Sequence, residues 1–206
     1  MDQKELRDAA LIVIDMQNGF CHPEGSVARA MDIEDNLAVI PVIGRLVDAA
    51  HESGLPVFWV TQEHLADDRS IDRSRLKNPQ TELSLPPCVR GSWDAELVDE
   101  LRERVTPDDV RIVKHRASGF YGTGLEVDLR MRGIREVLIC GVSSSYCVDG
   151  TARDAYSRDL RVTVIEDGCA SPWRDLHEAT MKNVSIFLGT VESSDSILGA
   201  IQTTKN

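Results

Sequence analysis

The chain has 206 residues, of which 42% are hydrophobic and 28% charged, and its formal net charge is −11. This length and composition are typical of one soluble globular domain, here residues 1–206. The negative charge argues against nucleic acid and anionic membranes as partners. Five scattered cysteines fit reduced thiols better than disulfides, and we find no hydrophobic leader and no apolar run of roughly 20 residues, so we expect a cytoplasmic protein.

Short apolar runs predict the strands of a buried sheet, and segments with helical spacing lie between them. The predicted strands are Ala9–Asp15, Pro56–Thr61, Val110–Val113, Val137–Cys140, Arg161–Glu166 (with a turn at Asp167 and Gly168) and Ile186–Leu188. The predicted helices are Asp35–Ser53, Trp93–Arg104, Leu125–Arg132, a helix from Val148, Pro172–Asn183 and a helix from Ser194. This alternation predicts an α/β fold, a single domain in which helices cover both faces of a parallel sheet.

The longest segment without predicted structure is Gln62–Gly91, which is polar and contains three prolines. A loop of this length inside a compact domain is usually functional or disordered. The sequence leaves open whether the segment forms an ordered lid.

Three reactive side chains fall at the carboxyl ends of predicted strands. Asp15 ends the first run, Lys114 follows Val113, and Cys147 stands where a strand and a tight turn lead into a helix. Each has an ordinary explanation, because such residues also cap turns, end strands in solvent or fill small buried sites. In open parallel sheets, however, ligands bind outside the carboxyl ends of the strands, so the three together predict a site.

The chemistry of this site would centre on the Cys147 thiol. The partial charge and free N–H groups of a helix N-terminus favour a thiolate and can hold an oxyanion. Asp15 can take the thiol proton if burial strengthens it as a base, and Lys114 can stabilise the thiolate. Cys147 would attack an amide-like carbonyl and expel an amine or ammonia, and water activated by Asp15 would hydrolyse the thioester. Cys140, inside an apolar strand, is expected to be inert.

Three segments, LIVIDMQNGF, VKHRASGFYGTGL and ICGVSSSYCVDGTARDA, resemble the isochorismatase-like cysteine hydrolase superfamily over nearly the whole chain. That family includes nicotinamidase, N-carbamoylsarcosine amidase, biuret hydrolase and ureidoacrylate amidohydrolase. The resemblance implies a doubly wound α/β fold and an Asp–Lys–Cys triad, here Asp15, Lys114 and Cys147. It also implies a cis peptide bond at Val142–Ser143 and an oxyanion hole formed by the N–H groups of Ser143 and Cys147.

Departures from the family pattern narrow the expected substrate. Nicotinamidases carry an Asp-x-His metal site after the second strand and a further histidine downstream. Here Glu63 and His64 do not match that spacing and no histidine lies between His64 and His115, so we expect no metal and no cofactor. Cys147 favours an amidase, and GFCHPEGS and FYGTGL are closest to the ureido and carbamoyl amide hydrolases. We expect hydrolysis of a small linear amide or ureido/carbamoyl compound; nicotinamidase or isochorismatase activity stays open.

Candidate substrate contacts have weaker support from the sequence, because aromatics often fill cores and arginines often cover surfaces. The candidates are Trp59, Phe120 and Tyr121 as apolar walls, Arg90 and Arg116 as carboxylate partners, and Gln17 as a positioning or turn residue. The expected partners are a small-molecule amide and further copies of the chain in a homo-oligomer, a dimer or a tetramer. A receiver domain or a flavin-binding module is disfavoured, because Asp15 has no acidic neighbour and MQNGF is no hydroxyl-rich phosphate loop.

Overall fold

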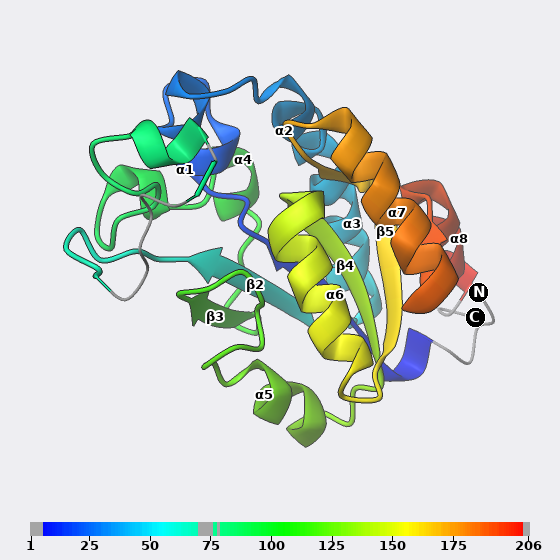
Figure 1. Ribbon diagram of the computed structural model, residues 1–206. Coiled ribbons are helices and arrows are strands. Elements are labelled where there is room, and N and C mark those ends of the chain that lie inside the picture. Colours follow the sequence, from blue (N-terminus) through cyan, green and yellow to red (C-terminus); the bar gives the residue numbers. More distant parts are fainter. Residues whose placement is uncertain (1–5, 70–75, 78, 204–206) are drawn as a thin grey trace.

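The computed structural model describes residues 6–69, 76–77 and 79–203, so part of the Gln62–Gly91 segment lies outside the described residues. Six strands form one sheet in the order β3-β2-β1-β4-β5-β6, and every pair is parallel (Figure 1). The strands are β1 (Ala9–Ile14), β2 (Val57–Gln62), β3 (Val110–Lys114), β4 (Glu136–Val142), β5 (Arg161–Ala170) and β6 (Thr190–Glu192). The sheet grows outward from β1 in both directions, which confirms the expected doubly wound α/β fold.

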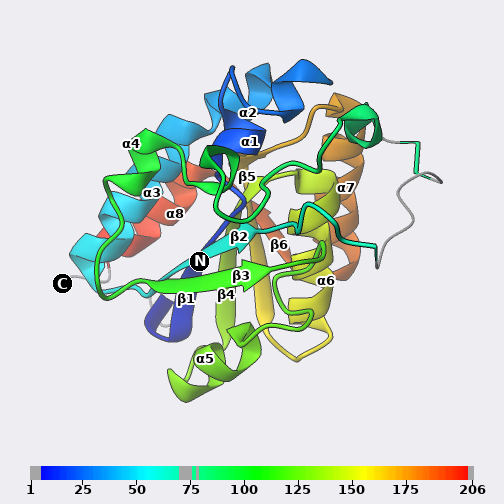
Figure 2. The ribbon, with the colours of Figure 1, turned by 90° about the vertical axis from the view of Figure 1, so that its left-hand side faces the viewer.

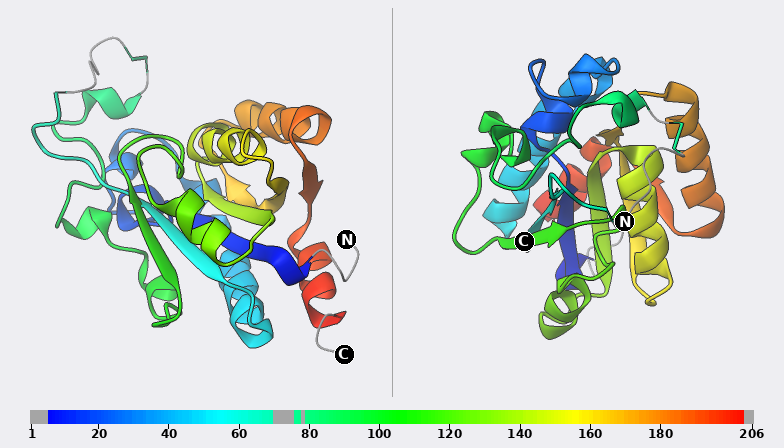
Figure 3. Two further views of the ribbon diagram at one scale, coloured as in Figure 1. Left: turned by 90° about the horizontal axis from the view of Figure 1, so that it is seen from below. Right: turned by 60° about the vertical axis from the view of Figure 1, so that its left-hand side comes forward.

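Helices cover both faces of the sheet. They are α1 (Asn18–Cys21), α2 (Glu34–Ala38), α3 (Ile40–Ser53), α4 (Asp99–Arg102), α5 (Leu125–Met131), α6 (Asp149–Tyr156), α7 (Arg174–Phe187) and α8 (Ser194–Thr203). Helices α3 and α8 pack together on one face, whereas α5, α6 and α7 lie on the other (Figures 2 and 3). No helix in the described part of the chain is long and apolar enough to cross a membrane.

Burial along the strands follows their position in the sheet. Every residue of the central strands β1 and β4 is buried, which is why both read as nearly continuous apolar runs. The edge strand β3 alternates instead, with Arg111 and Val113 exposed and Ile112 and Lys114 buried. The alternation therefore turns a lysine inward at the end of an edge strand.

The helix predicted over Asp35–Ser53 is in fact two helices, α2 and α3, that meet at Val39. Pro41 lies in the first turn of α3, where its missing N–H costs no helical hydrogen bond. Gly54 ends α3 with φ of 74°, a left-handed conformation that glycine adopts without strain.

The prediction of one helix over Trp93–Arg104 is wrong. The structure has a 3₁₀ turn at Trp93–Ala95 and the single-turn helix α4, with an extended stretch between them. That stretch pairs with the segment after β1, because Leu97 forms an antiparallel bridge to Gln17 and the Val98 N–H donates to the Met16 carbonyl at 3.1 Å. Tertiary pairing thus replaces the helix that the apolar spacing favoured.

Two predictions near the C-terminus are also wrong. Residues Ile186 and Phe187 belong to α7, and the last strand is β6, because a three-residue apolar run cannot distinguish a helix end from a strand. The turn predicted at Asp167 and Gly168 lies inside β5, which continues to Ala170 through an irregularity in its pairing with β4.

Candidate active site

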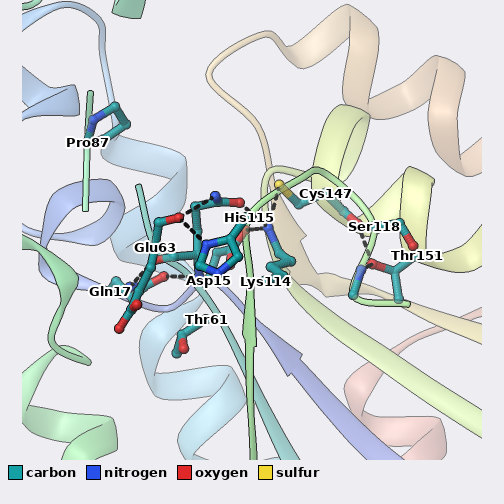
Figure 4. Close-up of polar contacts among 12 residues, drawn as sticks. Asp15, Gln17, Thr61, Glu63, Pro87, Lys114, His115, Ser118, Cys147 and Thr151 are labelled. Atoms are coloured by element: carbon teal, nitrogen blue, oxygen red, sulfur yellow. Dashed lines mark hydrogen bonds and ion pairs between the residues drawn. The ribbon is translucent and has the colours of Figure 1, made fainter. Parts of the chain in front are cut away.

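Four neighbouring strands bring four polar side chains to one edge of the sheet. Asp15 follows β1, Gln62 ends β2 and Lys114 ends β3. Cys147 follows β4 in a π-helical turn, Ser144–Val148, that leads into α6. Because these strands lie side by side and parallel, their carboxyl ends meet, and the structure brings Asp15, Lys114 and Cys147 together as predicted (Figure 4).

The backbones of the neighbouring strands β1 and β4 approach each other unusually closely near their carboxyl ends. Gly141 pairs with Ile14 and has φ of 119°, and a Cβ atom at Gly141 would lie 2.1 Å from the Ile14 carbonyl oxygen. Only glycine allows this approach. Next to it, Asp15 has φ of 54°, uncommon for a residue with a side chain, and its N–H donates to the Val60 carbonyl at 2.8 Å.

Lys114 is fully buried and has a polar partner for each of its three N–H groups. Its Nζ lies 2.8 Å from Asp15 Oδ2, 2.8 Å from Gln62 Oε1 and 3.3 Å from Cys147 Sγ. Burial alone would lower the pKa of Lys114, but the nearby Asp15 carboxylate and Cys147 sulfur outweigh it and raise the pKa above its ordinary value. Lys114 is therefore an ammonium ion in the site.

The Cys147 side chain is a protonated thiol at neutral pH. Burial raises its pKa to about 12, the Asp15 carboxylate adds to the rise, and the Lys114 ammonium opposes it. Apart from Lys114 and the Cys147 thiol, the buried oxygens of Asp15 have no donor among the described residues. Asp15 thus has spare acceptor capacity beside a thiol that must lose its proton before it can react.

The turn before Cys147 has the expected cis peptide bond at Val142–Ser143. The Ser143 carbonyl accepts the N–H groups of Tyr146 and Val148, each at 3.1 Å, and these bonds close the π-helical turn. The Ser143 N–H has no acceptor among the described residues, and Ser143 faces the cavity described below.

Further hydrogen bonds hold the turn that carries Cys147 against the loop after β3. Thr151 Oγ1 donates to the Cys147 carbonyl at 2.7 Å and accepts the Gly119 N–H at 3.0 Å. On the other side, His115 Nδ1 lies 2.9 Å from the Glu63 carbonyl, which links the end of β3 to the segment after β2. The loop predicted at 115–124 is therefore hydrogen-bonded to the segment after β2 through His115 and to α6 through Gly119 (Figure 4).

A cavity of about 450 Å³ opens above the Asp15–Lys114–Cys147 cluster. Its apolar and aromatic walls come from several elements, and basic or imidazole side chains lie among them. The lining residues are Asp15, Phe20, Val27, Asn36, Gln62, His64, Leu76, Lys77, Gln80, Thr81, His115, Arg116, Ala117, Val142, Ser143, Tyr146, Cys147, Pro172 and Trp173. Such a volume accommodates a small ligand.

Of the predicted substrate contacts, only Arg116 lines this cavity. The Trp59 indole donates to Asp109 Oδ2 at 2.8 Å, inside the fold. Arg90 pairs with Glu63 at 2.7 Å, and the Phe120 ring is buried with the Arg158 guanidinium 4.9 Å from its centroid. Tyr121 is 67% exposed and Gln17 is fully buried behind Gln62. These side chains fill the core or cover the surface, which is their ordinary role.

Gln62 and Trp173 were not among the residues predicted from the sequence. Gln62 ends β2 just as Lys114 ends β3, so the strand-end position that singled out Lys114 would also have found it. Trp173 follows β5 and lines the cavity, but nothing in its local sequence separates it from a core tryptophan.

His64 lies in the segment where nicotinamidases carry their metal ligands. Within the described ranges, no group of three or more histidine, cysteine, aspartate or glutamate side chains is arranged to hold an ion. His64 Nδ1 lies 2.6 Å from the Pro87 carbonyl, and the neighbouring Gln62 side chain, 3.4 Å from His64 Nε2, is a neutral amide. The expectation of a metal-independent protein remains a prediction.

Fold and site together define an α/β protein in which a buried thiol, an ammonium and a carboxylate meet at the carboxyl edge of the sheet, next to one pocket. The chain belongs to the isochorismatase family, since the isochorismatase domain matches residues 9–196. It is 36% identical over 189 residues to a probable inactive nicotinamidase of Arabidopsis thaliana, covering 90% of this chain and 93% of that protein. It is 32% identical over 209 residues to ureidoacrylate amidohydrolase RutB of Acinetobacter baylyi, covering 94% and 83%.

Solved structures agree with this assignment. N-carbamoylsarcosine amidase from Thermoplasma acidophilum superposes with a TM-score of 0.76 at 30% identity, covering 91% of this chain and 97% of that one. A cysteine hydrolase from Pseudomonas syringae gives a TM-score of 0.83 at 23% identity, covering 99% and 95%, which shows the shared fold.

Proposed function

We propose that this protein hydrolyses the C–N bond of a small linear amide or ureido/carbamoyl compound through a thioester, with Asp15, Lys114 and Cys147 as the catalytic residues. One observation carries the proposal. A single buried ammonium, Lys114 Nζ, lies 2.8 Å from an Asp15 carboxylate oxygen and 3.3 Å from the Cys147 sulfur, and both of these partners line a cavity. Such an arrangement lets the proton move between Cys147 and Asp15 while the cation stabilises whichever group is negative.

The proposed reaction has two halves. In the first, the Cys147 proton passes to Asp15, the sulfur attacks the carbonyl carbon, and the C–N bond breaks as Asp15 returns the proton to the leaving nitrogen. The products are an amine or ammonia and an acyl thioester on Cys147. In the second half, Asp15 takes a proton from water, the oxygen attacks the thioester, and the carbon–sulfur bond breaks. Asp15 then reprotonates the sulfur, which releases the acid.

The negative oxygen that forms in each half needs donors. We assign this role to the N–H groups of Ser143, which immediately precedes the π-helical turn before α6, and of Cys147, which lies within that turn. The Ser143 N–H has no acceptor among the described residues, and both residues line the cavity. Removal of one such donor typically slows an acyl transfer by about 10²–10³-fold.

The charge of the cavity bears on the substrate. Lys77 and Arg116 line it together with His64 and His115, while Asp15, the one acidic lining residue among those described, is paired with Lys114. A pocket lined by Lys77 and Arg116 in a protein of net charge −11 favours a substrate with a carboxylate away from the scissile bond, and Arg116, which also pairs with Asp68 at 3.7 Å, is the proposed partner. Two relatives bear names of this kind, ureidoacrylate amidohydrolase and N-carbamoylsarcosine amidase.

A panel of compounds read by ammonia release tests the proposal. It contains ureido acids, N-carbamoyl amino acids, simple primary amides and nicotinamide, with Cys147→Ala as the blank. Turnover of a ureido or carbamoyl acid supports the proposal, and turnover of nicotinamide alone assigns the scaffold to the alternative activity. No ammonia above the blank from any compound contradicts C–N hydrolysis.

A further inference from the structure

Gln62 is the third partner of Lys114, and no step of the proposed mechanism uses it. Its side chain is 4% exposed and its Oε1 accepts a hydrogen bond from Lys114 Nζ at 2.8 Å, as short as the ion pair with Asp15. It is uncharged, so it accepts from the ammonium without adding a second negative charge beside the thiol.

The orientation of the Gln62 amide follows from its other contacts. Its nitrogen lies 3.2 Å from the Glu63 carbonyl oxygen, which can only accept, so the amide oxygen must face Lys114. The backbone of Gln62 is clamped as well. Its N–H donates to Gln17 Oε1 at 2.8 Å, and Gln17 Nε2 donates to the Gln62 carbonyl at 2.9 Å and to the Ala95 carbonyl at 2.8 Å. Gln62 is therefore a fixed acceptor.

We propose that Gln62 is a positioning residue that sets the direction of the Lys114 ammonium, so that one of its N–H groups points at the Cys147 sulfur. The three N–H groups of Lys114 have three acceptors, and the contact with sulfur, at 3.3 Å, is the longest. Without Gln62, an N–H group would lack a buried partner and would turn to Asp15, whose oxygens have spare acceptor capacity. The ammonium would then move away from the sulfur.

The inference rests on the proposed role of Cys147 as nucleophile, but alkylation tests it without any substrate. Iodoacetamide reacts with the thiolate, so its rate against pH reports how strongly the site stabilises the sulfur anion. The rate is read at the Cys147 peptide by mass spectrometry. Gln62→Met keeps the length of the side chain but removes the acceptor. In this variant the curve of alkylation rate against pH should move to higher pH by about one unit, so that the rate at a given pH falls about tenfold.

Thr61→Val is the matched control. Thr61 precedes Gln62 on the same strand, its hydroxyl lies 3.5 Å from the Ile112 carbonyl, and it does not line the cavity. Its alkylation profile should match the wild type. If Gln62→Met does not fold, Gln62→Asn provides the second test, because it keeps an uncharged amide but is one methylene shorter, so its oxygen no longer reaches Lys114 and the profile should again shift to higher pH.

A profile that superimposes on the wild type, for either folded Gln62 variant, overturns the inference. So does an equal shift in Thr61→Val, because the effect would then come from the strand and not from the amide. An upward shift together with an inactive substrate panel would support the positioning of Lys114 and contradict only the proposed reaction.

Discussion

The Lys114→Met variant should lose a large part of the stability of this protein. Lys114 is fully buried and Asp15 is 1% exposed, so the substitution leaves a buried carboxylate without its cation. Breaking a buried ion pair by removing one partner typically costs about 3–5 kcal/mol of unfolding free energy. Because a domain of ordinary stability has about 5–15 kcal/mol in total, this change should be visible in any equilibrium unfolding measurement.

A double-mutant cycle separates the charge effect from lost packing. Asp15→Asn alone leaves a buried ammonium with only neutral acceptors around it, and it should cost a similar amount. The double variant Lys114→Met with Asp15→Asn removes both charges. Its loss should be at least about 2 kcal/mol smaller than the sum of the two single losses, because neither partner remains buried and unpaired.

Urea unfolding at neutral pH, followed by tryptophan fluorescence, measures all three variants. Lys182→Met, at an exposed position of α7, is the control and should change stability by no more than about 0.5 kcal/mol. Additive losses in the double variant would refute the reasoning, since they would mean that the two charges do not depend on each other in the folded protein.

Three further predictions concern the thiols and metals. Cys147→Ala should abolish turnover and leave the fold intact. Cys140→Ala should mainly lower the unfolding free energy, by about 1 kcal/mol. Near-normal turnover of a confirmed substrate by Cys147→Ala would contradict the role given to Cys147. Dialysis against a chelator should leave the rate unchanged, and activity lost on dialysis and restored by zinc or iron would disprove it. Burial raises the pKa of all five thiols, so the unfolded chain loses thiol protons first as pH rises above about 8.5. The unfolding free energy should therefore fall by up to about 1.4 kcal/mol per pH unit for each thiol. If the slope of unfolding free energy against pH is the same in Cys140→Ala as in the wild type, the prediction is refuted.

The sequence by itself determined the class of fold and the ends of the central strands. The runs that became β1, β2 and β4 are buried on both faces, so their apolar character is continuous and local. Because the carboxyl ends of parallel strands meet, the position of Asp15, Lys114 and Cys147 at strand ends was enough to predict that they lie together. Glycine at position 54 marked the end of α3 for an equally local reason, its left-handed backbone.

Only the tertiary structure decided which side chains face the cavity and which support the site from behind. Trp59 and Phe120 fill the core, although an aromatic in a pocket wall has the same local sequence signal. Gln62 became the acceptor for Lys114 only because β2 lies between β3 and β1, and strand order is set by contacts between residues far apart in the chain. The segment around Leu97 is extended for the same reason: its partner, Gln17, lies 80 residues earlier, beyond the reach of any local pattern.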